Sequence, residues 1–434
     1  MLINFRVENF RSLKDAQELD LRPVYRKGSD SLTVSAIYGA NASGKSNVLR
    51  ALEFMHDAVT DQGGWNNRNR IHVRPFLLDQ ESKKNPTSFA VELLIDGIKY
   101  NYGFTASREQ ILEEWLHSFP KRKKRVLFER DGSEYYFGPS FASARAEVIK
   151  EITPPTALYL STAAKANESS ARAVFSWFSQ QLWFADDADG SRAMQRGQTM
   201  SLLRDPSKKE RVEKLLAAAD LGISETQVED FEIEFREDPE KKEFDGSFRV
   251  AYDNGKATIY YRGQRPELPL HLRTLIETDS SLTFRHRGKV EHEFTLEQES
   301  RGTQTWFDIV GMVVRALDEG HTLVVDELDT SLHPLLLAQM IRLFQEEESN
   351  PSKAQLIFTT HDASLMGRSQ GEELLRRDEI WFTQKNADTG STELYPLTDF
   401  KPRDGLNWEK RYLGGAVGAV PYISENMFHE AMSR

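Results

Sequence analysis

Residues 39–46 are Gly-Ala-Asn-Ala-Ser-Gly-Lys-Ser and match the pattern G-x-x-x-x-G-K-[ST] in full. In this pattern the glycines let backbone N–H groups wrap around phosphates, while Lys45 reaches the β- and γ-phosphate oxygens and the Ser46 hydroxyl ligates Mg²⁺. An apolar strand is predicted before the loop and a helix after it, so the positive end of a helix dipole adds to the anion site. The segment therefore predicts a phosphate-binding loop.

A pair of carboxylates follows the apolar run at 321–325, where the chain continues with Asp326 and Glu327. Asp326 can hold Mg²⁺, directly or through water, and Glu327 can polarise the water that attacks a phosphate. Solvated acids at the end of an ordinary strand are the alternative. The presence of a phosphate loop in the same chain favours the interpretation as a Mg²⁺-dependent hydrolytic site.

Two acids directly after a hydrophobic strand resemble the Walker B motif of ABC-type ATPases, in which the second acid is the catalytic base. The resemblance implies a signature motif upstream, and residues 299–304 (Glu-Ser-Arg-Gly-Thr-Gln) are similar to it, with Ser300 and Gly302 at the key positions. In that family the signature opens a helix and binds the γ-phosphate held by the opposite subunit. A serine and a flexible glycine at a helix N-terminus suit that task.

The same resemblance implies a D-loop and a switch histidine. Residues 331–334 (Ser-Leu-His-Pro) occupy the D-loop position, where His333 replaces the usual aspartate. His361 ends the next predicted strand and can hydrogen-bond the γ-phosphate and report its loss. Gln80 is the positional candidate for the Q-loop, although a plain loop glutamine is the stronger interpretation there.

The N-terminal Asn9-Phe10-Arg11-Ser12 resembles the opening of SMC-like and RecF-like ATPases, in which the arginine lies near the nucleotide phosphates. More narrowly, the segments YGANASGKSN, DELDTSLHP, TTHD and EKRYLGGAVGAVP resemble the RloA-type AAA/ABC family of bacterial ATP-binding proteins. Those proteins are often encoded beside a nuclease or another toxin in anti-phage islands. The resemblance covers both ends of the chain and hardly touches its middle.

The resemblance implies an α/β fold of the ABC-type, SMC/RecF-like P-loop ATPase class, with a mixed sheet and a helical and β insertion. ATP and Mg²⁺ are the implied cofactors. The predicted catalytic residues are Lys45, Glu327 and His361, and the predicted metal ligands are Ser46 and Asp326. The predicted nucleotide-binding residues are Arg11, Gly39, Asn41, Ala42, Ser43, Gly44, Lys45, Ser46, Asn47, Ser300 and Gly302.

Periodicity places these residues on alternating elements. The expected strands are 2–10, 32–38, 89–95, 99–104, 231–235, 248–252, 258–261, 282–286, 290–296, 321–326 and 355–359. The expected helices are 48–59, 168–184, 207–221, 304–318 and 333–348. Turn signals stand at Asp96-Gly97, Asp253-Asn254-Gly255 and Arg287-Gly288-Lys289. The late β–α–β order predicts parallel strands.

The motifs divide the chain into a first part of the ATPase core (1–115), an inserted lid or partner-binding region (116–284) and a second part of the core with a tail (285–434). In the middle, Lys121–Arg125 follow Pro120 as a basic run between two apolar segments, which predicts a hairpin tip. A solvated loop that keeps a sheet edge soluble is favoured there over phosphate contact. Trp177, Phe178, Trp183 and Phe184 form an apolar stripe, for which core packing is favoured over partner binding or base stacking.

Composition limits the classes. The chain has 434 residues with 56 Lys+Arg and 67 Asp+Glu, a net charge of −11, which argues against a generic DNA coat. It has no cysteine, which excludes disulfides and thiolate chemistry. No apolar run is long enough to span a bilayer and no signal peptide is evident, so a cytoplasmic protein is expected.

Three outputs are compatible with this ATPase core. The first is an ATP-bridged homodimer or higher homo-oligomer that senses phage infection and controls a separately encoded effector, a nuclease or another toxin. The second is a RecF- or SMC-like DNA-repair ATPase that binds nucleic acid directly; the absence of a long heptad pattern and the negative charge weigh against it. The third, an OLD-like ATPase-nuclease, is disfavoured because the 434 − 361 = 73 residues after His361 lack a suitable acidic cluster. A transporter ATPase fits poorly.

Overall fold

A computed structural model gives the fold. It describes residues 1–25, 28–60, 70–186, 189–219, 222–228, 232–237, 248–253, 256–261, 276, 282–286, 292–369, 372–401, 406–421 and 432. The predicted turns at 254–255 and 287–289 lie outside the described residues. The chain forms two compact units: unit 1 joins Met1–Phe184, Glu319–Asp329 and Ala338–Arg434, and unit 2 joins Ala185–Asp318 and Thr330–Leu337.

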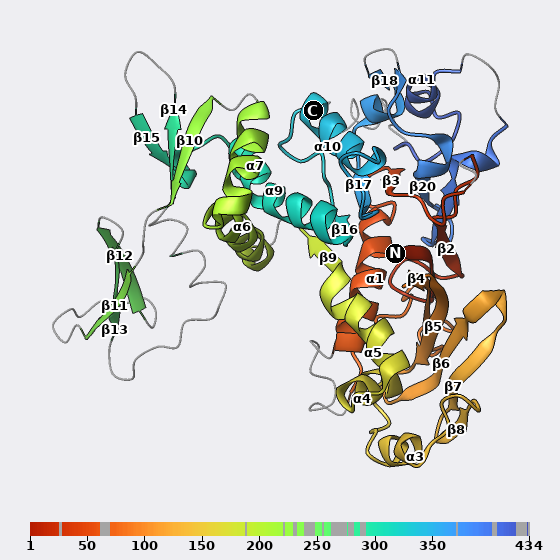
Figure 1. Ribbon diagram of the computed structural model, residues 1–434. Helices are drawn as coiled ribbons and strands as arrows, with labels where there is room; N and C mark the ends of the chain where they lie inside the picture. The colour runs from red at the N-terminus through yellow and green to blue at the C-terminus, as the bar shows by residue number, and fades with distance from the viewer. Residues whose placement is uncertain are drawn as a thin grey trace. The chain divides into compact units, whose positions relative to one another are not determined.

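Unit 1 contains a seven-stranded antiparallel sheet in the order β2-β1-β4-β5-β6-β7-β8 (Figure 1). The predicted turn at Asp96-Gly97 joins β4 to β5 with φ of 49° and 73°, the left-handed pair that a tight hairpin turn requires. The strands are β1 (Leu2–Glu8), β2 (Gln17–Asp20), β4 (Thr87–Ile95), β5 (Ile98–Ala106), β6 (Ile111–Phe119), β7 (Arg125–Asp131) and β8 (Glu134–Phe137).

A second sheet of unit 1 has the order β21-β20-β3-β17-β16-β9. Its centre is parallel, from β20 through β3 and β17 to β16, and β21 pairs antiparallel at one edge. Segments from both ends of the chain therefore meet in one mixed sheet, as the red and blue strands of Figure 1 show. The strands are β3 (Val34–Gly39), β9 (Leu182–Ala185), β16 (Thr322–Val325), β17 (Gln355–Thr360), β20 (Ile380–Lys385) and β21 (Thr392–Pro396).

The helix α1 (Lys45–Thr60) leaves β3 and packs its apolar face into the main core of unit 1. That core joins α1 residues such as Leu52 and Met55 to Phe89 of β4 and to Ile357 of β17, so side chains from both sheets contribute to it. The other helices of unit 1 are α3 (Ala144–Glu151), α4 (Tyr159–Lys165), α5 (Ser169–Ser176) and α11 (Trp408–Leu413), and α10 (Pro334–Gln345) begins in unit 2. Two short strands, β18 (Arg368–Ser369) and β19 (Glu372–Glu373), form a separate pair.

The helix predicted over 168–184 is wrong at its C-terminal end. The α-helix α5 stops at Ser176, a π-turn covers Trp177–Gln181, and β9 follows. The helical periodicity extends into Leu182–Ala185, but these apolar and aromatic residues favour a strand where an edge of the mixed sheet is open to them. Core packing is confirmed for Trp177 and Phe178, which are fully buried.

The described part of unit 2 contains the helices α6 (Asp189–Leu203), α7 (Pro206–Ala218) and α9 (Arg301–Glu319). The buried Asp308 of α9 accepts hydrogen bonds from Nε of Arg192 at 2.9 Å and of Arg196 at 2.7 Å. A Cβ at Gly311 would lie 2.5 Å from the backbone N of Thr199, so only glycine permits this approach of α9 to α6.

Two small sheets complete the described part of unit 2. The first has the order β10-β14-β15 and the second β11-β13-β12, and the second carries its own apolar cluster around Ile259. The predicted strands 248–252 and 258–261 are confirmed as an antiparallel pair. The strands are β10 (Ile223–Val228), β11 (Glu232–Glu237), β12 (Phe248–Asp253), β13 (Lys256–Tyr261), β14 (Leu282–His286) and β15 (His292–Thr295).

The predicted α/β class with a mixed sheet is confirmed. The predicted division of function at residues 115 and 284 stays a prediction. No helix in the described part of the chain combines the length and apolar character needed to cross a membrane.

Candidate functional site

The phosphate loop lies where the sequence predicts it, between the end of β3 at Gly39 and the start of α1 at Lys45. Gly44 has φ of 110°, and a Cβ there would lie 2.3 Å from Oγ1 of Thr392, so the turn requires glycine. The first turn of α1 has no acidic residue to occupy its free N–H groups. The loop and the helix N-terminus together offer backbone donors to an anion.

Two threonines from the β20–β21 hairpin support the back of the loop. Thr392 donates through Oγ1 to the Ser43 carbonyl at 2.7 Å, and Thr383 Oγ1 lies 2.7 Å from Ser43 Oγ. Both threonines are buried. Sequence analysis missed them, because they stand more than 300 residues from the loop and only the strand order brings them beside it.

Lys45 is already bent back over the loop. Its Nζ donates to the carbonyls of Gly39 at 2.9 Å and Ala40 at 3.2 Å, and it lies 3.5 Å from Nδ1 of His361. Burial lowers the pKa of Lys45, and the carboxylate of Glu327 is the largest influence in the opposite direction. The structure thus brings two of the predicted catalytic residues, Lys45 and His361, into contact.

A chain of hydroxyls and carboxylates joins the phosphate loop to the end of β16. Ser46 Oγ donates to Asp326 Oδ1 at 3.0 Å, and Thr359 Oγ1 donates to the same oxygen at 2.6 Å. Thr359 Oγ1 also accepts from the backbone N–H of Glu327 at 2.7 Å. A hydroxyl beside a carboxylate is the hard-oxygen donor set that Mg²⁺ prefers when phosphates supply the other ligands, so Ser46 and Asp326 fit this ion.

Glu327 is exposed and has φ of 52°, a left-handed conformation that costs a residue with a side chain of order 1 kcal/mol. Its bond to Thr359 holds this conformation. Asp329 accepts from the backbone N–H of His361 at 3.2 Å and 3.3 Å and so fixes the turn after β17. The predicted site did not include Asp329, although its place two residues after Glu327 is a signal in the sequence.

A cavity of about 450 Å³ lies over these groups. It brings together the loop, the predicted base and the switch histidine, all within unit 1. Three further residues line it that the sequence analysis did not select for this purpose: Ser12, Arg50 and Lys385. The predicted residues that line it are Asn41, Ala42, Ser43, Gly44, Lys45, Ser46, Asn47, Glu327 and His361.

Each residue of the N-terminal Asn-Phe-Arg-Ser segment has a structural partner or place. Asn9 holds a distant loop, accepting from the N–H of Phe76 at 3.0 Å and donating to the Ser82 carbonyl at 2.8 Å. Phe10 is buried. Ser12 Oγ accepts from Nδ2 of Asn47 at 2.7 Å, so Asn47 contacts the N-terminal segment through its side chain.

Arg11 faces a neighbouring cavity of about 440 Å³, which Arg74 and Lys385 also line. Burial, with the charges of Arg74 and Arg50, lowers the pKa of Arg11. Its buried Nε has no hydrogen-bond partner in the described part of the chain. An anion near this side chain would relieve that crowding of positive charge.

The C-terminal Glu409–Pro421 packs behind the phosphate-loop strand. The Tyr412 ring lies 5.8 Å from that of Tyr38 in β3 and stacks at 5.7 Å on Phe382 of β20. The Tyr395 hydroxyl donates to the Val417 carbonyl at 2.9 Å. This conspicuous sequence segment therefore supports the site from behind, and none of its residues lines the cavity.

The predicted signature belongs to unit 2. Ser300 is exposed, and its Oγ accepts from the N–H of Thr303 at 3.1 Å, which makes it the cap of the 19-residue α9. A Cβ at Gly302 would lie 2.9 Å from the carbonyl oxygen of Ser331, so the signature and the D-loop segment touch within this unit. Gln80 is exposed in a turn of unit 1 and lines neither cavity.

The fold and the loop define an ABC-type P-loop ATPase core, in which a mixed sheet presents a phosphate loop beside a paired-acid strand end. The chain belongs to the family described as "AAA domain, putative AbiEii toxin, Type IV TA system", which matches residues 34–367. No curated protein matches the chain.

Several solved structures resemble the chain at low identity. An SMC head domain from Thermotoga maritima is 13% identical, with a TM-score of 0.38 over 91% of this chain and 98% of that one. An SMC head bound to the C-winged helix domain of ScpA is 12% identical, with a TM-score of 0.42 over 95% and 99%. An SMC head with an extended coiled coil bound to the C-terminal domain of ScpA, derived from Pyrococcus furiosus, is 11% identical, with a TM-score of 0.39 over 96% and 98%.

Proposed function

We propose that this protein hydrolyses ATP with Mg²⁺ and that ATP bridges two copies, each offering its phosphate loop to the signature of the other. The observation that carries the proposal is the bonded chain from Ser46 through Asp326 and Thr359 to Glu327. It joins phosphate loop, metal-ligand candidates and candidate base in one pre-formed arrangement, which hydrolysis of a phosphoanhydride needs.

Each residue then has a role. Lys45 exchanges its carbonyl partners for phosphate oxygens, and Ser46 and Asp326 hold Mg²⁺, which when bound neutralises charge on the phosphates. Glu327, exposed and fixed by Thr359, accepts a proton from the attacking water. His361 lies beside Lys45 and donates to the γ-phosphate. Ser300 and the N–H groups of α9 supply donors to the γ-phosphate of the opposite copy.

The biological output we propose is that of a sensor and regulator in bacterial anti-phage defence, of the RloA type, which restrains or releases a separately encoded nuclease or toxin. The family description, with its putative toxin and Type IV TA system, supports this output. Occupancy of the bridge by ATP would set the shape that the effector binds.

Replacing Glu327 with glutamine tests the bridge. We expect Glu327→Gln to bind ATP within about threefold of wild type, to lose hydrolysis by roughly 100-fold, and to accumulate as a dimer with Mg-ATP. Steady-state phosphate release and light scattering measure the two effects. Glu347→Gln, at an exposed position of the same unit, is the matched control. Hydrolysis at the wild-type rate would contradict the assignment of the base, and a monomer with bound ATP would contradict the bridge.

The proposed role as a regulator of an effector is tested by purifying tagged Glu327→Gln protein from its native host with Mg-ATP and measuring the mass of the intact complex. A second protein at fixed stoichiometry is expected. Nucleic acid without a protein partner would instead support the DNA-repair alternative, with direct binding of DNA by this chain.

A further inference from the structure

Three carboxylates stand side by side on the exposed face of the antiparallel sheet of unit 1. Register pairs Glu113 with Asp131 and Asp131 with Glu134 across β6, β7 and β8. Like charges directly opposite one another on neighbouring strands are destabilising. No cation of the described residues forms an ion pair with any of the three, and Glu113 accepts only from Oγ1 of Thr105 at 3.2 Å. We call these three residues the acidic row.

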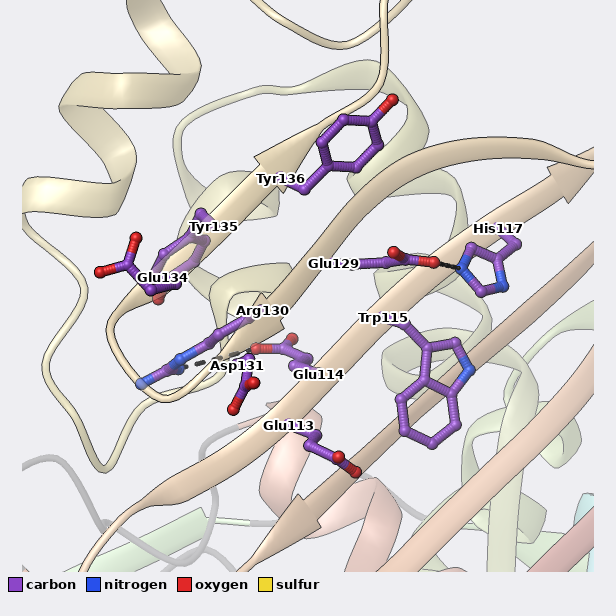
Figure 2. A pocket seen from close by; sticks show the side chains of 10 residues that line it. All are labelled: Glu113, Glu114, Trp115, His117, Glu129, Arg130, Asp131, Glu134, Tyr135 and Tyr136. Carbon is purple, nitrogen blue, oxygen red and sulfur yellow. Dashed lines mark hydrogen bonds and ion pairs between the residues drawn. The ribbon is translucent and has the colours of Figure 1, made fainter.

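The acidic row lines a cavity of about 580 Å³, shown in Figure 2. The one arginine there, Arg130, is committed elsewhere: it donates to the backbone carbonyls of Gly132, Ala157 and Pro155 and pairs with the buried Glu114. It therefore leaves the acidic row unneutralised. Among the described residues no cluster of three or more acids and histidines has the geometry to hold a metal ion.

Two aromatic side chains lie beside the acidic row, one register position further along the same face of the sheet. Trp115 and Tyr136 lie on either side of Glu129, whose carboxylate is 2.7 Å from Nε2 of His117 (Figure 2). The Trp115 indole donates to Asn101 Oδ1 at 2.7 Å, which fixes its ring, and Tyr136 is 55% exposed. Exposed, oriented Trp and Tyr side chains are typical centres of protein interfaces.

The opposite end of the same hairpin is strongly basic. Lys121, Arg122, Lys123, Lys124 and Arg125, which we call the basic tip, are all exposed where β6 turns into β7. Their one ion pair among the described residues is Lys124 with Glu129, at 3.8 Å. The predicted hairpin tip is thus confirmed, and its charge is almost wholly uncompensated by the described residues.

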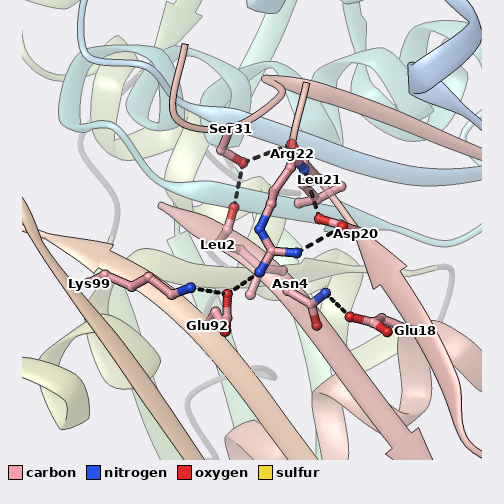
Figure 3. A network of polar contacts seen from close by, with 9 residues as sticks. All are labelled: Leu2, Asn4, Glu18, Asp20, Leu21, Arg22, Ser31, Glu92 and Lys99. Atoms are coloured by element: carbon pink, nitrogen blue, oxygen red, sulfur yellow. Dashed lines mark hydrogen bonds and ion pairs between the residues drawn. The ribbon is translucent and has the colours of Figure 1, made fainter. Parts of the chain in front are cut away.

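The other half of the same sheet face is different, as Figure 3 shows. There Glu92 binds both Arg22 and Lys99, and Arg22 also binds Asp20 at 2.9 Å. Asn4 donates to Glu18. Charges on strands β1, β2, β4 and β5 therefore compensate one another locally. Separation of charge along one hairpin is a particular property of β6–β8.

We propose that this hairpin face docks against the same face of a second copy, with the strands of the two copies antiparallel. A two-fold axis lying in the interface, across the strands, would place each acidic row opposite the partner's basic tip. The six residue steps from Glu113 to Phe119 span about 20 Å between row and tip, so both contacts form together. Trp115 and Tyr136 lie next to the acidic row, on its side toward the basic tip. This contact needs no nucleotide and is separate from the ATP bridge.

Two charge-reversed variants test the pairing in nucleotide-free protein. The row variant is E113K/D131K/E134K and the tip variant is K121E/R122E/K123E. Each would oppose like charges in its own homodimer, so each is expected to remain a monomer where wild type is a dimer. An equimolar mixture restores opposite charges at both contacts and is expected to form a heterodimer. Native mass spectrometry distinguishes the monomers, the wild-type dimer and the heterodimer by mass.

A milder variant and a change of salt concentration still test the dimer if the charge-reversed row variant misfolds. E113Q/D131N/E134Q removes repulsion, so we expect a higher melting temperature with a dimer roughly tenfold weaker. The wild-type dimer is expected to weaken several-fold between 50 and 300 mM salt. K83E/K84E, at exposed lysines of unit 1 outside this face, is the control and should leave the mass unchanged.

A monomeric wild-type protein at low salt, or a mixture that stays monomeric, would overturn the proposal. So would a tip variant that loses only nucleic-acid binding, which would assign the basic tip to phosphate contact. Since the dimer is measured without ATP, its failure leaves the bridged dimer of Glu327→Gln untouched, and the reverse also holds.

Discussion

The phosphate loop of unit 1 and the signature of unit 2 are supported in different ways. Side chains from distant segments hold the loop, among them Ser12, Thr383 and Thr392. The signature relies on local contacts: Ser300 caps its own helix and Gly302 fits beneath the carbonyl of Ser331. The first arrangement is a finished anion site, whereas the second is an exposed helix end that offers donors. The contrast agrees with our proposal that unit 1 binds nucleotide and that unit 2 acts on nucleotide bound by another copy.

The largest effect is expected from a substitution in the phosphate loop of unit 1. Lys45→Met removes a cation that would bind phosphate oxygens through charge-assisted hydrogen bonds, each contributing about 1.5–3 kcal/mol. We expect ATP affinity to fall by roughly 100-fold and hydrolysis to be lost. Isothermal titration calorimetry measures the affinity. Lys385→Met, at another cation of the same cavity, is the control, and an equal loss there would show that charge alone matters.

A substitution in the signature of unit 2 should slow ATP hydrolysis and leave ATP affinity almost unchanged. In Ser300→Glu a carboxylate at the start of α9 suits the helix dipole, so folding is retained, but it repels the γ-phosphate. We expect ATP affinity within about twofold of wild type and a hydrolysis rate lower by roughly 100-fold. Fluorescent-nucleotide titration and phosphate release measure the two quantities. Ser300→Asn keeps a neutral cap and serves as the comparison; weakened binding in Ser300→Glu would contradict the division between units.

A pH effect on stability is expected from a buried carboxyl group of unit 1. Glu379 is buried and accepts from the N–H of Arg376 at 2.7 Å, and burial raises its pKa from 4.5 to about 7. Between pH 4.5 and 7 the carboxyl of Glu379 keeps its proton in the folded chain but has lost it in the unfolded chain. The free energy of unfolding therefore falls as the pH rises from 4.5 to 7, by up to about 3 kcal/mol. This contribution of Glu379 to stability is fully present below pH 4.5.

Glu379→Gln keeps an acceptor without a titrating proton, so we expect unit 1 of this variant to lose that slope. Urea unfolding at pH 5, 6, 7 and 8 measures it, with Glu347→Gln as the exposed control. An unchanged slope in Glu379→Gln would assign the pH dependence to another group.

The smallest effect concerns the support behind the loop. Thr392→Val preserves shape but removes the donor to the buried Ser43 carbonyl and to Ser12 Oγ. Loss of a buried hydrogen bond costs about 1–3 kcal/mol, so we expect a KM for ATP about tenfold higher with little change in kcat. Thr389→Val, at an exposed threonine of the same hairpin loop, is the control. A normal KM in Thr392→Val would show that the loop holds its shape unaided.

Local pattern determined much of this protein. The loop at 39–46, the acids at 326–327, the tight turn at Asp96-Gly97 and the strands β3, β16 and β17 of the parallel centre could be predicted, because turn chemistry and periodicity act over a few residues. The strand at Leu182–Ala185 could not, since its aromatic residues match a helical period and only an available sheet edge decides between the two.

Tertiary structure alone decided which residues support the phosphate loop and how the charges are arranged on the surface of β6–β8. Thr383 and Thr392 carry no motif, and strand order places them at the loop. The three acids of the acidic row are ordinary charges in the sequence, whereas the basic tip was predicted as the end of a hairpin. Antiparallel register aligns the first across three strands and sends the second to the far end of the hairpin. Periodicity tells a residue which face of its own strand it occupies, but the neighbour across the sheet is set by pairing between segments, and pairing depends on the whole fold.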